Sequence, residues 1–117
     1  MKKKPRTSTR FESSTREQAL FCRRFTTLVS AKVPILETIA VCIKEAPNPG
    51  MAAALVNAME SIKSGSGMTV QLAKFPGHFS PTMLALFSAG ELDGTIDHTT
   101  ARLADFLEKA VALEKGA

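Results

Sequence analysis

Apolar side chains recur every three or four residues along most of this chain, which is the spacing of helices that bury one face. The first such segment covers residues 14–31, and Ser14-Thr15-Arg16-Glu17 has the capping-box pattern that marks where a helix begins. Its stripe consists of Leu20, Phe21, Arg24, Phe25, Leu28 and Val29. Lys32 and Val33 then form the predicted turn.

Two further segments begin at a proline. Pro34 suits the first position of a second helix that runs towards Glu45. Asn48 and Pro49 combine a cap with a proline, and they predict a third helix that ends at the Ser/Gly run of residues 64–67. The expected inner faces carry Ile35, Leu36, Ile39, Cys42 and Ile43 in the second helix, and Met51, Ala54, Leu55, Ala58, Met59 and Ile62 in the third.

Three more helices follow the Ser/Gly run. Residues 68–74 suffice for a short helix with Met68 and Leu72 inside, and Phe79 is expected to enter the core. Ser80-Pro81 begins a fifth helix, which should bury Met83, Leu84, Leu86 and Phe87. The last and longest helix covers residues 95–115, and its expected inner face is Ile96, Thr99, Thr100, Leu103, Phe106, Leu107, Ala110, Val111 and Leu113. No alternating strand pattern occurs, so the predicted fold is all-α, a six-helix bundle.

Composition and charge indicate that the chain has two parts. A length of 117 residues with 44% apolar side chains is enough for one domain without disulfide or metal staples. The net charge of +4 comes from Lys2, Lys3, Lys4, Arg6 and Arg10, because without them ten basic residues face eleven acidic ones. We therefore predict a flexible basic arm at residues 1–13 and a helical domain at residues 14–117. The arm is either a solvated terminus or a contact for an anionic membrane or nucleic acid.

Cys22 and Cys42 have no metal-binding spacing, and we expect both to be reduced thiols in a reducing compartment. No stretch approaches the roughly 18–20 apolar residues of a membrane span, and the N-terminus lacks the apolar run of a signal peptide. The chain is therefore expected to be soluble by itself, which is compatible with its being one part of a membrane protein.

Two glycines bracket two carboxylates in the segment Ser88-Ala89-Gly90-Glu91-Leu92-Asp93-Gly94-Thr95-Ile96. We expect Gly90 and Gly94 to form a structural turn, because glycine adopts backbone angles that other residues resist. Glu91 and Asp93 should then lie beside the first turn of the last helix, where the helix dipole stabilises carboxylates.

Glu91, Asp93 and Asp97 are also weak candidates for a site that binds a divalent cation such as calcium, which prefers oxygen ligands. One chain offers too few ligands, although a second subunit could add more. The alternative is that these carboxylates cap the last helix and face water. We expect no cofactor.

The histidines give little support to catalysis. His78 lies in a Gly/Pro loop, and His98 follows Asp97 directly on a helix, where the two side chains cannot face one target. Both histidines are expected to be solvated or to act as capping donors. The Ser/Gly run lacks the Gly-Lys-Ser/Thr ending of a phosphate-binding loop. An enzyme that used the acidic segment would also need a supporting His or Cys set, so we predict no catalytic residues and no enzyme activity.

Three stretches of the chain together resemble the type II secretion system F domain. They are residues 20–37, residues 64–79 with Phe75-Pro76 and Phe79, and residues 89–96. The last looks like the family's pattern of Gly-Glu, a small or polar pair, Gly, any residue and Leu, with Ile96 in place of Leu and Asp93 in place of Ser. Lys32 stands where the family commonly has Gly, and Arg24 stands where Gln is usual.

This resemblance implies a cytoplasmic domain of an inner-membrane platform protein in type II secretion and type IV pilus machines. Such proteins resemble two copies of the domain joined through membrane helices, and we favour the first copy here. The implied role is not enzymatic: the domain couples a hexameric ATPase to the platform and to assembly of pilin or pseudopilin. The implied partners are this ATPase and other platform components, with Glu91 and Asp93 as the partner-binding residues, and self-association as a homodimer is a further expectation.

A small helical nucleic-acid-binding module that uses the basic arm is the alternative. Its affinity would fall steeply with salt, because phosphate contacts release counterions. The charge of −1 outside the first ten residues opposes this alternative, and we expect no nucleic-acid partner.

Overall fold

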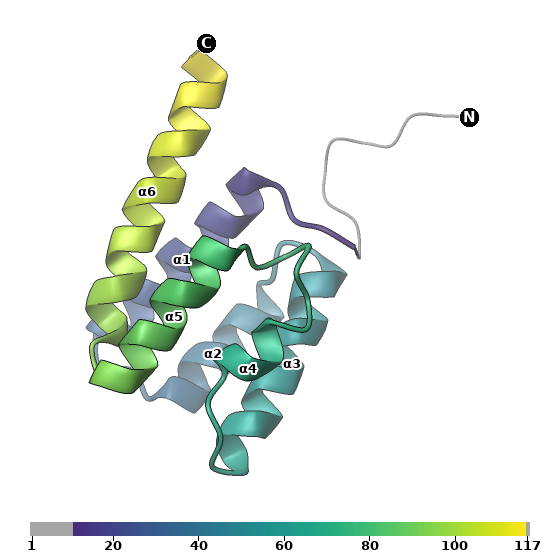
Figure 1. Cartoon of the computed structure of the whole chain (residues 1–117), viewed down its shortest axis with the longest axis vertical. Helices are drawn as coiled ribbons and strands as arrows, with labels where there is room; N and C mark the ends of the chain where they lie inside the picture. Colours follow the sequence, from purple (N-terminus) through teal and green to yellow (C-terminus); the bar gives the residue numbers. More distant parts are fainter. Residues whose placement is uncertain (1–10, 117) are drawn as a thin grey trace.

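The computed structural model describes residues 11–116, and within this range the chain forms six helices and no strand. The helices are α1 (Thr15–Ser30), α2 (Ile35–Lys44), α3 (Pro49–Lys63), α4 (Thr69–Leu72), α5 (Pro81–Asp93) and α6 (Ile96–Gly116) (Figure 1). The predicted all-α fold with six helices is therefore confirmed. None of these helices is long and apolar enough to cross a membrane.

The predicted basic arm falls mostly outside the described residues, which begin at Phe11. Its last residues are in contact with the domain, because the Ser13 amide donates a hydrogen bond of 2.9 Å to the carbonyl of Gly77. The helical domain therefore makes its first contacts slightly before the predicted boundary at Ser14.

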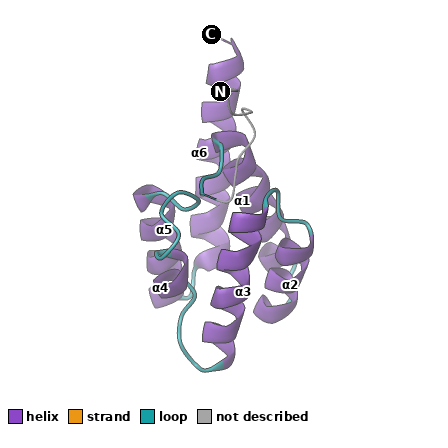
Figure 2. Cartoon of the chain, turned by 90° about the vertical axis from the view of Figure 1, so that its right-hand side faces the viewer, coloured by secondary structure: helices purple, strands orange, loops and turns teal. Residues whose placement is uncertain are grey.

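The helices form two groups that share α1 as the central element. On one side α6 packs along α1 and against α5, and on the other side α2 contacts α1 and packs on α3, which holds α4. The groups also meet where α4 contacts α5. Figures 1 and 2 both show the C-terminal half of α6 projecting beyond the other helices, and the long axis of the molecule measures 45 Å against 28 and 23 Å for the others.

Local sequence determines most helix starts. The Ser14 hydroxyl accepts from the Glu17 amide at 3.1 Å, and the Ser14 amide donates to the Glu17 carboxylate at 3.0 Å, which confirms the capping box. Asn48 and Ser80 cap α3 and α5 with a proline in the first turn, as predicted. Pro34 is one residue outside its helix: it has extended backbone (φ −57°, ψ 148°) and is itself the N-cap of α2.

The core contains a cluster of four phenylalanines. Phe21 and Phe25 come from α1, Phe87 comes from α5, and Phe79 enters from the loop before α5, as predicted. Their paired ring centroids lie 5.4 to 6.0 Å apart, in tilted, edge-to-face and stacked arrangements. The predicted inner residues Met51, Ala54, Leu55, Ala58, Met68, Leu72 and Met83 are buried too.

The predicted stripes were wrong at three large apolar side chains. Phe106 and Leu113 on α6 are 59% and 69% exposed, and Leu20 on α1 is 49% exposed. Leu113 belongs to the projecting end of α6, where no other helix covers it. Helix α4 is also shorter than predicted, because the chain leaves the helix after Leu72 and continues in turns towards Phe79.

Candidate partner-binding site

The glycine-bracketed segment forms the joint between α5 and α6, but the helix ends later than expected. Helix α5 continues through Gly90, Glu91 and Leu92 to Asp93. Gly94 is its C-cap and has a left-handed backbone (φ 73°), and the Thr95 amide donates to the Gly90 carbonyl at 3.0 Å. A residue with a side chain would be strained at Gly94, so glycine provides the bend there.

Gly90 serves a different purpose from the one that we expected. It is buried within α5, and a Cβ atom added to it would lie 2.7 Å from the Cα of Ile96. Real Cβ atoms do not approach backbone so closely, because the repulsion is steep. Gly90 therefore permits the first turn of α6 to pack directly on α5, and it does not bend the chain.

The Glu91 carboxylate reaches across to α4. It accepts hydrogen bonds from the Met68 amide (2.6 Å), the Thr69 amide (3.2 Å) and the Thr69 hydroxyl (2.5 Å). These amides are among the donors at the start of a helix that have no partner within it. Glu91 thus caps α4, which contradicts the expectation that it lies at the first turn of α6.

Asp97 is the carboxylate that occupies the first turn of α6, where it accepts from the His98 amide at 2.9 Å. Asp93 is exposed, and its side chain makes no hydrogen bond or ion pair with any described residue. Between residues 11 and 116, no group of three or more His, Cys, Asp or Glu side chains could hold a metal ion. Glu91, Asp93 and Asp97 therefore do not form the candidate cation site within the described chain.

An apolar cavity of about 300 Å³ lies at the same joint. Ile35, Ile62, Met68 and Ile96 line it, together with Gly90, Glu91, Gly94 and Ser66. The neighbouring Leu92 is 83% exposed. The joint therefore combines an unpaired carboxylate, a small apolar hollow and an exposed leucine, which are features of a surface that another protein can contact.

Comparison with known sequences identifies the protein family. The family described as Type II secretion system (T2SS), protein F, matches residues 21–115. The chain belongs to this family.

Individual relatives agree with this assignment. The chain is 33% identical over 99 residues to the Type 4 fimbrial assembly protein PilC of Pseudomonas putida, which covers 85% of the chain and 25% of that protein. It is 29% identical over 96 residues to the Type IV pilus assembly protein PilC of Pseudomonas aeruginosa (82% and 26%). It is 28% identical over 95 residues to the Type II secretion system protein F of Vibrio cholerae (81% and 23%). The chain thus spans about a quarter of the length of these relatives.

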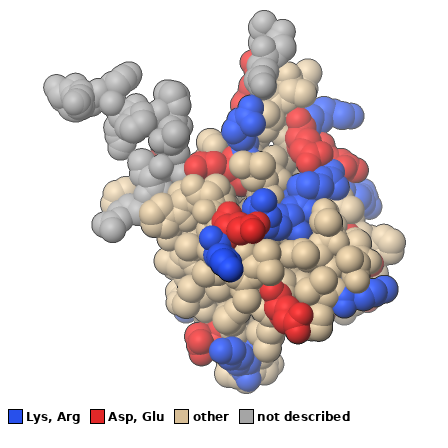
Figure 3. Space-filling model, turned by 180° about the vertical axis from the view of Figure 1, so that it is seen from behind, with Lys and Arg blue, Asp and Glu red and all other residues tan. Residues whose placement is uncertain are grey.

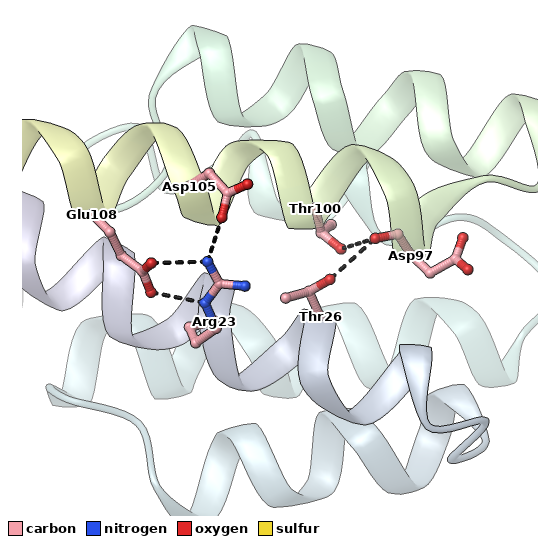
Figure 4. Close-up of polar contacts among 6 residues, drawn as sticks. All are labelled: Arg23, Thr26, Asp97, Thr100, Asp105 and Glu108. Atoms are coloured by element: carbon pink, nitrogen blue, oxygen red, sulfur yellow. Dashed lines mark hydrogen bonds and ion pairs between the residues drawn. The ribbon is translucent and has the colours of Figure 1, made fainter.

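In this T2SS protein F domain, polar contacts that sequence analysis missed join α1 to α6 (Figure 4). The Arg23 guanidinium donates to both Glu108 oxygens at 2.8 Å and to Asp105 at 2.6 Å. These bonds hold the pKa of Arg23 above its usual range and the pKa of Glu108 below it. Further along, the Thr26 hydroxyl donates to the Asp97 carbonyl at 3.1 Å. The predicted apolar stripe included Arg24 and not Arg23, so the periodicity did not predict that Arg23 contacts the last helix.

The second feature missed in this family member is the environment of His78. His78 is 2% exposed and therefore not a solvated loop residue. Its Nδ1 lies 2.6 Å from the Ser13 hydroxyl, which also accepts from the Asn48 amide group at 2.9 Å. His78 therefore connects the start of the domain, the cap of α3 and the loop before α5. Ser13 is half-buried, and neither Ser13 nor His78 lines any of the cavities described for this protein, so the hydrogen bond between them packs the start of the domain against the loop before α5.

Both cysteines of this T2SS protein F domain are buried and free, as expected for reduced thiols. Burial raises the pKa of Cys42 to about 12. Burial also raises the pKa of Cys22, and the negative charge of an ionised Cys42 would raise it further. Neither thiol is therefore activated for catalysis.

Proposed function

We propose that the chain is a cytoplasmic domain of an inner-membrane platform protein that helps to assemble a type II secretion or type IV pilus machine. The match to the protein F family over residues 21–115 carries this proposal. The names of the relatives, which refer to fimbrial or pilus assembly and to type II secretion, support both kinds of machine. The domain acts as an interaction module without a cofactor, and it connects the assembly ATPase to the platform and thereby to pilin or pseudopilin.

The α5–α6 joint is the contact surface that we assign to this function. Asp93 is exposed and lacks a partner within the described chain, and Leu92 beside it is 83% exposed. Glu91 is exposed in part of its side chain, but its carboxylate also caps α4. Glu91 therefore positions the joint, while Asp93 supplies a carboxylate that is free to meet a partner.

Full-length platform proteins carrying Asp93→Arg or Glu91→Ala test this assignment in a secretion or piliation assay. We expect both variants to impair assembly although the core of the isolated domain still folds, because Asp93→Arg removes the carboxylate that faces the partner and Glu91→Ala removes the cap on α4 that positions the joint. Thr69→Val is the matched control, since it removes a hydrogen bond to Glu91 and loosens α4 without changing the acidic surface.

Three results decide the assay. Normal assembly by both acidic variants would contradict the contact surface, whereas a failure of the wild-type gene to complement a platform deletion would contradict the proposed function. An equal defect in Thr69→Val would show that α4 order, and not the acidic surface, is the requirement.

A further inference from the structure

A second surface lies along α1, far from the joint. A groove of about 540 Å³ runs between α2 and α6, and α1 forms its floor. Arg16, Leu20, Arg24 and Leu28 line it at four-residue spacing, so it follows one face of α1 for about 18 Å at 1.5 Å per residue. Its shape is therefore elongated and suits a helix rather than a compact small molecule.

Apolar side chains contribute to the floor and to both walls of this α1 groove, beside the charged residues that also line it. Ala19, Leu20 and Leu28 contribute from α1, while Val41 from α2 and Val111 from α6 form the sides. Leu20 is 49% exposed although it lies on the central helix of the fold. A half-exposed leucine between two flanking helices is the kind of anchor position that a partner helix covers.

Ion pairs connect each wall of the α1 groove to its floor. Arg23 joins α1 to Glu108 on the α6 side at 2.8 Å, and Arg24 joins α1 to Glu45 beside α2 at 2.8 Å. Each wall is therefore tied to the floor by a charged contact, and α2 and α6 make no contact with each other. A preformed groove binds with less ordering cost than one that must open.

The charges around the α1 groove define the partner. Figure 3 shows acidic and basic side chains interspersed on the face seen from behind. Both lining glutamates, Glu45 and Glu108, are already paired, whereas the Arg16 side chain makes no hydrogen bond or ion pair with the described residues. The uncompensated charge at the groove is therefore positive, and an acidic side chain complements it.

We propose that the α1 groove binds one amphipathic helix of a partner protein, with an apolar stripe over Leu20 and an acidic residue beside Arg16. This surface is separate from the α5–α6 joint, because Val111 lies about 22 Å along α6 from Ile96 at 1.5 Å per residue. The inference therefore does not depend on which residues of the joint meet a partner.

Two designed 18-residue helical peptides test the α1 groove in the isolated 117-residue chain. Both carry the same Leu/Ala stripe, which is flanked by glutamates in one peptide and by lysines in its twin. Titration followed by NMR should give shift changes at Leu20, Leu28, Val41 and Val111 with the acidic peptide, and binding at least threefold weaker with the lysine twin.

Variants make the test specific. Leu20→Glu should reduce binding of the acidic peptide at least tenfold, and Arg16→Glu, at an exposed position, should reverse the preference between the twins. Val70→Glu on α4, which also replaces an exposed valine, should bind like the wild type. No binding of the acidic peptide at millimolar concentration, shifts outside the groove, or unchanged preference in Arg16→Glu would overturn the proposal.

Discussion

Lys32 has a backbone conformation that is unfavourable for lysine. Its φ is 70°, in the left-handed region, and it closes α1 with two hydrogen bonds: Lys32 N to Val29 O and Val33 N to Leu28 O, both 3.0 Å. This is the Schellman arrangement, in which glycine is the preferred residue. Glycine, which the family commonly has at this position, adopts the left-handed conformation without strain.

Lys32→Gly should stabilise the isolated domain by about 0.5–1 kcal/mol. Removal of the left-handed strain gains roughly 1–2 kcal/mol, and the greater freedom of glycine in the unfolded chain offsets part of this gain. Urea unfolding measures the difference. Lys32→Ala is the control, because it removes the charge but keeps the strain, and an equal gain in that variant would contradict the explanation.

At the scale of elements, one side chain holds the shortest helix in place. Helix α4 has four residues, and the first amides of any helix lack partners within it. Glu91 supplies partners for two of them from α5, so the joint that bends the chain also fixes α4. The contact between the two helix groups at α4 and α5 therefore depends on a polar interaction as well as on packing.

Glu91→Ala should release α4 while the rest of the domain stays folded. We expect the Met68 and Thr69 amides to lose hydrogen-exchange protection, and the free energy of unfolding to fall by about 1–3 kcal/mol, which is typical of lost hydrogen bonds to a charged group. Amide exchange followed by NMR resolves the effect.

Asp93→Ala is the control for this exchange experiment, since Asp93 is exposed and has no partner within the described chain. It should change stability by less than about 0.5 kcal/mol. Equal protection of Met68 and Thr69 in wild type and Glu91→Ala would refute the capping role.

The sequence predicted features that depend on near neighbours and missed those that depend on distant ones. Ser14, Asn48 and Ser80 cap their helices through amides three residues away, so their role is visible in a short pattern. The partners of Glu91 lie 22 and 23 residues away, and Ser13 lies 65 residues from His78. No local pattern encodes such pairs.

Periodicity has a related limit. It indicated correctly that α6 has an apolar face, but it could not indicate how far other helices extend along that face. Phe106 and Leu113 continue the expected pattern and are nevertheless exposed. The same reasoning explains Leu20, whose position between α2 and α6 became clear only when the helices were assembled.

At the scale of the whole molecule, charge is distributed in a way that suits contact with proteins. Outside the first ten residues the net charge is −1, and acidic and basic side chains are interspersed on the face in Figure 3. A nucleic-acid-binding surface instead gathers lysine and arginine into a patch or stripe. Adjacent ion pairs such as Arg23 with Asp105 and Glu108 reduce the field further.

The isolated domain should therefore not bind DNA or RNA at physiological salt. Fluorescence anisotropy with labelled duplex and single-stranded oligonucleotides, at 50 and 150 mM salt, measures this, because phosphate contacts weaken steeply between these concentrations. Deletion of residues 1–13 is the control for the basic arm. Salt-sensitive binding that survives the deletion would contradict the prediction.

The pairing of the first long helix with the last has a consequence for how the chain folds during synthesis. Helices α1 and α6 share the most extensive interface, and contacts such as Arg23 with Glu108 join positions 85 residues apart. Phe21 and Phe25 on α1 also pack against Phe79 and Phe87, which come from the loop before α5 and from α5, much later in the chain. Until α5 and α6 have left the ribosome, these apolar side chains of α1 lack their native partners, so the α1 face is exposed to chaperones in the meantime.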